Sequence, residues 1–223
     1  EELQNSSTFY DMNGDGQMHR TAWAGQGQGI LAIDANGDGK ISGKEEVVFT
    51  EWDKSADTDL QALKNVFDTN HNGKLDAGDA RFGDFRVIVN GQVKTLALAG
   101  IASIDLTGKG TGETYSDGSK ISDTTTFTKT DGTLGKVGDA SFAVDAVGAN
   151  VTSSSVTNAD GTTTVTQKSF DASGAVISSV ATTWSLDGKT KVTKFDDNGD
   201  GLFERTVTDA TQTDANNVIT ETI

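Results

Sequence analysis

Apolar and polar positions follow different rhythms in the two halves of the chain. In the first half, short apolar segments separate loops rich in Asp, Asn and Gly. Within it, Leu60, Leu63, Val66 and Phe67 recur at the spacing of one face of a helix. This stripe predicts a helix that runs directly into the loop beginning at Asp68.

Further along the first half, the pattern becomes that of strands. Residues 85–89 and 93–98 alternate in polarity around Asn90-Gly91, a pair that readily takes the two positive-φ positions of a type I′ turn. A hairpin is therefore expected, and residues 101–106 are expected to add a third strand to it.

The second half is rich in Thr, Ser and Val, and its turn glycines recur every 13 to 16 residues. Those glycines are Gly118, Gly132, Gly148, Gly161, Gly174, Gly188 and Gly201. Asp-Gly turns between runs of strong strand propensity predict an antiparallel meander of hairpin repeats. Stacked repeats of this kind are expected to continue in a longer parent polypeptide.

The amino-acid composition changes at the glycine-rich stretch 106–112, which suits a linker. Two domains are predicted, at residues 1–106 and 107–223. The predicted class is α+β, with an N-terminal EF-hand-like module of short helices and a small hairpin, followed by the β meander.

The composition of the chain restricts the classes of partner that it can bind. The formal charge of −15 repels phosphate backbones and anionic membranes, which argues against nucleic acid as a partner and favours cations. Hydrophobic residues are only 34% of the chain, so the hydrophobic core is expected to be small and bound metal is expected to add to the stability of the fold. The absence of cysteine excludes disulfides and thiolate sites, and no apolar run approaches the ~20 residues of a membrane span.

Two loops carry oxygen ligands at the spacing that calcium needs, which is positions 1, 3, 5, 7, 9 and 12 with glycine at 6. In residues 34–45 these are Asp34, Asn36, Asp38, the Lys40 carbonyl, Ser42 and Glu45. In residues 68–79 they are Asp68, Asn70, Asn72, the Lys74 carbonyl, Asp76 and Asp79. Ile41 and Leu75 at position 8 are expected to pair the two loops face to face, which would make binding cooperative. The alternative for each loop is a plain surface turn.

Two further loops begin in the same way but lack the acid at position 12. Residues 11–22 offer Asp11, Asn13, Asp15 and the Gln17 carbonyl, with His19 at position 9 and Ala22 at 12. Residues 196–207 offer Asp196, Asn198, Asp200, the Leu202 carbonyl and Glu204, with Val207 at 12. For both, a metal site and a hairpin turn remain open alternatives.

Catalytic motifs are not apparent. The histidines, His19 and His71, both lie inside loops whose spacing is already explained, and neither suits a general base. Nucleophile elbows, phosphate-cradling loops and His-Glu-x-x-His are missing from the sequence. Trp23, Trp52 and Trp184 could stack on sugar rings, but core packing is the simpler interpretation.

The order of these features resembles a known family. FYDMNGDGQMHRTAWAGQGQGILAIDANGDGKISGKEE, LQALKNVFDTNHNGKLDAGDARFGDFRV and LALAGIASIDL are together similar to the calcium-binding module of large RTX-type exoproteins. The Thr-rich repeats, with KFDDNGDGLFERTVTDATQTDANN, are similar to the repetitive tails that follow such modules.

The resemblance implies type I secretion and folding in the calcium-rich exterior of a bacterial cell. One branch of the family is self-processing and uses calcium to drive cleavage of an adjacent Asp-Pro bond. This chain contains no proline, and it lacks the RTX nonapeptide. The expected function is that of a non-enzymatic, calcium-dependent structural module; the alternatives are a self-processing module acting on an Asp-Pro outside the chain, or an adhesin segment that binds glycan or a cell surface.

Overall fold

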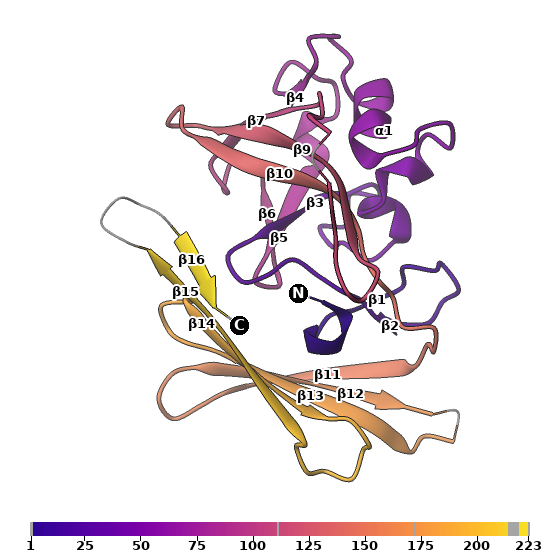
Figure 1. Ribbon diagram of the computed structural model, residues 1–223, viewed down its shortest axis with the longest axis vertical. Helices are drawn as coiled ribbons and strands as arrows, with labels where there is room; N and C mark the ends of the chain where they lie inside the picture. Colours follow the sequence, from indigo (N-terminus) through magenta and orange to yellow (C-terminus); the bar gives the residue numbers. More distant parts are fainter. Residues whose placement is uncertain (1, 111, 172, 214–218, 223) are drawn as a thin grey trace. The chain divides into compact units, whose positions relative to one another are not determined.

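Two compact units make up the chain. The computed structural model describes residues 2–110, 112–171, 173–213 and 219–222 (Figure 1). Unit 1 combines residues 3–28 with the described residues after 143, and unit 2 comprises residues 29–143. The N-terminal segment thus folds with the C-terminal repeats, far away in sequence.

Unit 2 contains a three-stranded and a five-stranded antiparallel sheet. The first has the order β3 (Gly29–Ile33), β5 (Phe85–Val89) and β6 (Gln92–Thr95). The second has the order β10 (Leu134–Ser141), β9 (Lys120–Lys129), β7 (Ile101–Asp105) and β4 (Lys74–Asp76), with β8 (Glu113–Thr114) also paired to β9. The predicted hairpin at Asn90-Gly91 is confirmed as β5–β6, and both turn residues have positive φ. Residues 101–106 do not extend that hairpin, because β7 pairs with β4 and β9.

The helix predicted from the apolar stripe is α1 (Asp59–Val66), and Thr58 caps its N-terminus by accepting from the backbone N–H of Gln61. Its buried face, Leu60 and Leu63, joins the core of unit 2. Three phenylalanines, Phe49, Phe67 and Phe85, meet in that core with ring centroids 5.2 to 6.2 Å apart. Such aromatic packing concentrates apolar burial in a chain that has few hydrophobic residues.

The α+β class and the helical EF-hand module are wrong. Strands form four sheets, and α1 is the one α-helix in the described part of the chain. The 34–45 loop is entered from β3 and left through the 3₁₀ turns η2 (Lys44–Glu46) and η3 (Phe49–Glu51). The 68–79 loop is left through a third, η4 (Phe82–Asp84). Short 3₁₀ turns thus stand where the second helix of each expected helix–loop–helix would be, and the strand β3 stands in place of the first helix of the 34–45 loop.

Unit 1 is dominated by a six-stranded antiparallel sheet whose strands follow one another in order (Figure 1). They are β11 (Asn150–Thr157), β12 (Thr163–Phe170), β13 (Val176–Trp184), β14 (Thr190–Asp196), β15 (Arg205–Thr213) and β16 (Ile219–Thr222). This is the meander expected from the turn glycines, although it begins at residue 150. The N-terminal segment adds a short 3₁₀ turn, η1 (Leu3–Asn5), and the pair β1 (Phe9–Tyr10) and β2 (His19–Arg20).

The sheet of unit 2 runs through the predicted linker. Strands β9 and β10 come after residue 106, yet β9 pairs with β7, which comes before it, and β10 pairs with β9. Residues 29–143 consequently form one compact unit. The division into domains at residues 1–106 and 107–223 stays a prediction.

The N-terminus of α1 holds two carboxylates. Asp139 accepts from the backbone N–H of Leu60 at 3.1 Å, and Asp59 accepts from that of Thr50 at 2.8 Å. Burial, with the nearby charge of Asp139, raises the pKa of Asp59 to about 6. Ionised Asp59 therefore destabilises the folded unit.

Asp59→Asn is predicted to stabilise the chain at pH 7. The folded state holds the Asp59 proton up to about pH 6 and the unfolded state loses it near the ordinary value of 3.8, so wild-type stability falls as pH rises between these values. The variant escapes this loss, and we expect a gain of about 1–2 kcal/mol at pH 7 that vanishes near pH 4. Urea unfolding followed by circular dichroism measures it. Asp57→Asn, at an exposed position two residues earlier, serves as the control, and an equal gain at both pH values would contradict the interpretation.

Candidate metal loops

All four predicted loops have the same backbone wrap. In each, the aspartate at position 1 accepts from the N–H of the glycine at position 6, at 2.9 to 3.2 Å, and the side chain at position 5 accepts from the N–H at position 7, at 2.8 to 2.9 Å. The position-1 aspartates are Asp11, Asp34, Asp68 and Asp196. The side chains at positions 1 and 5 are thus turned inward, as cation-binding loops of this length require.

Positive φ at positions 4 and 6 makes the wrap possible. Glycine occupies seven of these eight positions, with φ between 68° and 88°. The exception is His71 at position 4 of the 68–79 loop, with φ of 57°. An L-residue there carries strain that glycine avoids.

In the 34–45 loop, the acid that reaches back is Glu46 rather than Glu45. Glu46 is 1% exposed, and its carboxylate accepts from the backbone N–H groups of Ala35 at 3.1 Å, Ser42 at 2.7 Å and Gly43 at 2.9 Å. Glu45 is exposed and offers its backbone carbonyl to the indole of Trp52. Glu45 as the position-12 ligand stays a prediction, while the 3₁₀ turn η2 brings the next residue, Glu46, back to the loop amides.

Asp34 is the most informative side chain of this loop. It is 5% exposed; its Oδ2 accepts from Arg86 at 3.0 Å and from Gly39, whereas Oδ1 is buried with no hydrogen-bond partner among the described residues. A buried carboxylate oxygen without a partner is costly. Calcium, a hard cation that binds oxygen, fits that atom.

The 68–79 loop has the corresponding arrangement around Asp79. This carboxylate is 6% exposed and accepts from Thr69 at 2.8 Å, Asn70 at 3.2 Å and Asp76 at 2.9 Å. The amides it receives at positions 2 and 9 are those that Glu46 receives in the earlier loop. Asp79 and Glu46 therefore play equivalent parts.

The two loops are not paired through their position-8 residues. Leu75 lies in β4 and pairs with Ile104 of β7, where both are buried in the core. Ile41 is only partly buried and lies outside the strands. The expected cooperative loop pair is replaced by separate docking of each loop on its own sheet.

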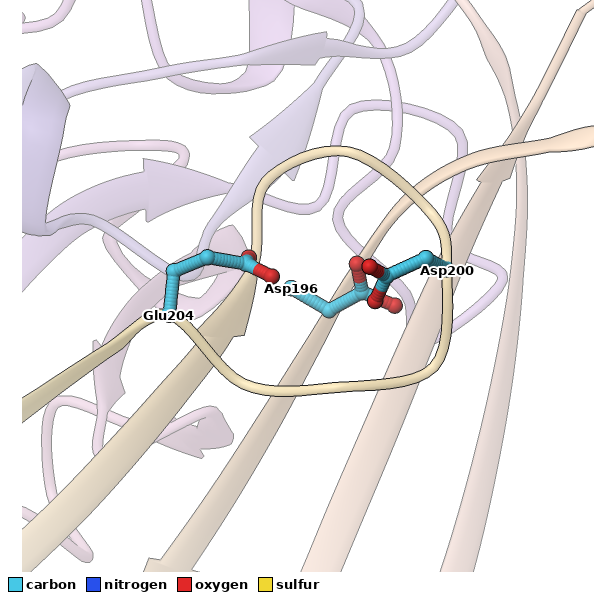
Figure 2. Close-up of side chains that lie close together, drawn as sticks. All are labelled: Asp196, Asp200 and Glu204. Atoms are coloured by element: carbon cyan, nitrogen blue, oxygen red, sulfur yellow. The ribbon is translucent and has the colours of Figure 1, made fainter.

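In unit 1, the 196–204 loop connects β14 to β15 and brings three carboxylates together (Figure 2). One oxygen from each of Asp196, Asp200 and Glu204 lies within 4.8 Å of the others, and they form the one such group found in the described part of the chain. Burial acts to raise the pKa of Asp196, but the N–H groups of Gly201 and Gly199 outweigh it, so the pKa is lowered and the buried carboxylate stays ionised. Asn198 donates to Glu204 at 3.3 Å, while the Leu202 side chain is exposed.

The 11–22 loop ends differently. His19 is 2% exposed; its Nε2 lies 3.1 Å from Asp15 and its Nδ1 lies 2.8 Å from the carbonyl of Asp145. Ala22, at position 12, is fully buried and offers no ligand. The Gln17 N–H donates to Asp15 at 2.9 Å.

Two inward-facing residues, Glu46 and His19, are not among the ligands that the loop spacing predicts. Glu46 lies one position beyond the twelve-residue template, although a second glutamate directly after Glu45 is visible in the sequence. His19 stands at position 9 of its loop. Its orientation depends on Asp145, 126 residues away, and no local signal indicates that contact.

Comparison with known proteins identifies the family. The SPM domain matches residues 2–143, more than half of the chain, and the chain therefore belongs to the SPM domain family. It is also similar to the iron-regulated protein FrpA of Neisseria meningitidis serogroup C, with 29% identity over 153 residues, which is 63% of this chain and 14% of FrpA. The chain thus spans about a seventh of that relative's length. Neither comparison indicates a catalytic family.

The tryptophans and the helix length add little to the candidate site. Trp23 stacks on Tyr10, and Trp52 packs edge-on against Phe67, as core-forming aromatics do. In the part of the chain that the structure describes, no helix has the length and apolar character needed to cross a membrane.

His71→Val is predicted to destabilise unit 2. A β-branched residue at a φ of 57° costs about 1–2 kcal/mol relative to one that tolerates this region. His71→Asn keeps a residue type suited to positive φ and is the matched control. Its midpoint of urea unfolding should equal that of the wild-type chain. If the Val and Asn variants unfolded alike, the strain assigned to position 4 would be refuted.

Proposed function

We propose that the chain is a calcium-binding structural module of a larger secreted RTX-type bacterial protein. The observation that carries the proposal is the buried Oδ1 of Asp34, which has no hydrogen-bond partner in the part of the chain that the structure describes. The residues that would hold calcium in unit 2 are Asp34, Asn36 and Asp38 with Glu46, and Asp68, Asn70 and Asn72 with Asp79. Membership of the SPM domain family and likeness to part of FrpA support the placement in a long exoprotein.

Charge explains why the ion would matter to the fold. Asp34, Glu46, Asp68 and Asp79 are all at most 6% exposed, so unit 2 buries two carboxylates in each loop. Arg86 contacts Oδ2 of Asp34 at 3.0 Å, and among the described residues Oδ1 has no hydrogen-bond partner. A buried carboxylate pair without enough counter-charge is repulsive, and a divalent cation removes the repulsion.

Calcium then stabilises the folded state by mass action. Binding to the native loops alone contributes about 2.7 kcal/mol per site when free calcium exceeds Kd a hundredfold. In a cell interior poor in calcium this contribution is lost, and it returns outside. The module would accordingly be more stable after secretion than before it.

This function requires no catalysis by the chain. Asp-Pro cleavage needs a proline, and the chain contains none. Calcium-triggered self-processing would have to act on a bond outside residues 1–223.

Calorimetric titration of the chelator-stripped chain with calcium, with urea unfolding at both ends of the titration, tests the proposal. We expect two or more sites and a clear rise in the urea midpoint. Glu46→Gln should weaken one site at least about tenfold, since it removes a carboxylate that orders the loop. Glu45→Gln, the adjacent exposed glutamate, should bind as the wild type does.

Failure would take two distinct forms. Binding that is absent up to several millimolar calcium would refute the function itself. Equal weakening by Glu45→Gln and Glu46→Gln would leave calcium binding intact but overturn the assignment of Glu46.

A further inference from the structure

Arg86 faces the 34–45 loop from strand β5, which pairs with β3 (Figure 1). Its side chain is 19% exposed, and its Nη2 donates to Oδ2 of Asp34 at 3.0 Å. Its Nη1 donates to the backbone carbonyls of Gly83 at 2.8 Å and Phe85 at 3.0 Å. Main-chain atoms thus hold the guanidinium as well, and its position does not depend on the Asp34 carboxylate alone.

The backbone of Asp34 is tied to the same segment. Its N–H donates to the carbonyl of Asp84 at 2.9 Å, and β3, which ends one residue earlier at Ile33, pairs with β5. The sheet therefore brings together an arginine and an aspartate that lie 52 positions apart in the sequence. The contact between them is built into the fold of unit 2.

The wrap of the loop does not require this arginine. The position-1 aspartates of the other loops, Asp11, Asp68 and Asp196, accept from the glycine at position 6 in the same way. In the part of the chain that the structure describes, none of these three carboxylates forms an ion pair with arginine or lysine. What Arg86 adds to its own loop is therefore charge rather than shape.

That charge matters because the loop buries two carboxylates. Asp34 is 5% exposed and Glu46 is 1% exposed, and the hydrogen bonds described for Glu46 all come from backbone amides. A cation beside Asp34 offsets part of the mutual repulsion in the calcium-free loop. The same positive charge repels an ion bound to Oδ1 of Asp34, because one carboxylate would then contact both cations.

We propose that Arg86 is a built-in counter-charge of the 34–45 loop, which stabilises the calcium-free fold and lowers the calcium affinity of that loop. This inference rests on the proposed function and concerns the regulation of one of its sites. In the described part of the chain, the buried carboxylates of the 68–79 loop accept from backbone amides and the Thr69 hydroxyl and have no ion pair. That loop is the internal reference.

The test follows calcium binding loop by loop, by NMR of the chelator-stripped chain. The amide of the glycine at position 6 donates to the position-1 aspartate, so Gly39 and Gly73 each report their own loop. The loops also differ at position 5, where Asp38 corresponds to Asn72. The decisive comparison is therefore one loop with and without Arg86, and not one loop against the other.

Three variants make that comparison. Arg86→Gln removes the charge, and we expect the Gly39 signal to reach its midpoint at about three- to tenfold less calcium, with the Gly73 midpoint unchanged. Arg86→Lys keeps the charge and should stay close to the wild-type midpoints. Lys136→Gln, at an exposed position on β10 of the same unit, controls for the loss of one positive charge.

Urea unfolding gives an independent readout. Arg86→Gln should lower the midpoint more in chelator than in saturating calcium, because the bound ion replaces the missing counter-charge. If the variant only lost its hydrogen bonds to the Gly83 and Phe85 carbonyls, both midpoints would fall equally. In the wild-type chain, the side-chain Nε resonance of Arg86 should shift at the same calcium concentration as Gly39.

The failures are distinguishable. Glycine signals that do not respond up to several millimolar calcium would refute the proposed function, and this inference with it. If Gly39 responds in the wild type but Arg86→Gln leaves its midpoint unchanged or raises it, calcium binding stands and the role of Arg86 is overturned. An Arg86 resonance that stays still while Gly39 shifts overturns that role without any substitution, so poor folding of a variant cannot rescue it.

Discussion

The hydrogen bond from the N–H of a glycine at position 6 to the aspartate at position 1 is the constraint on which the loops depend. It recurs at Asp11, Asp34, Asp68 and Asp196, in both compact units. It closes a tight wrap that needs positive φ at two positions, and it turns carboxylate and amide oxygens toward a common centre. Strands, the helix α1 and 3₁₀ turns lie on either side of these loops.

What the wrap encloses differs between units. In unit 2 each loop buries two carboxylates. The aspartate at position 1 accepts from the glycine at position 6, and the later acid accepts from the backbone amides of positions 2 and 9. This concentration of negative charge favours a divalent cation. In unit 1 the position-9 side chain is a carboxylate in one loop, Glu204, and an imidazole in the other, His19, and each lies 3.3 Å from the asparagine at position 3.

In unit 1, the N-terminal segment contacts strands that lie far away in the sequence. Gln26 donates its backbone N–H to Asp209, which is fully buried on β15, and Arg20 lies over the ring of Phe195 on β14. Arg20 and Arg205, the position-10 residues of the 11–22 and 196–207 loops, both approach Asp197. The family match covers residues 2–143, yet His19 in its first loop is hydrogen-bonded to the carbonyl of Asp145, which follows the matched segment.

The sequence by itself determined the features that are local: the helix from Leu60 to Phe67, the Asn90-Gly91 hairpin, the order of the Thr-rich strands, and the wrap of each Asp/Asn/Gly loop. Each depends on residues within a dozen positions, where spacing and φ preference decide. Only the tertiary structure decided that β7 joins β4 and β9, that Glu46 faces inward in place of Glu45, that the N-terminal segment folds with the repeats, and that His19 points its Nε2 into its loop. The orientation of Glu46 depends on the 3₁₀ turn that follows its loop, whereas the other outcomes depend on pairing and burial between residues that lie up to 183 positions apart. A one-dimensional pattern carries no record of which distant surface will cover it.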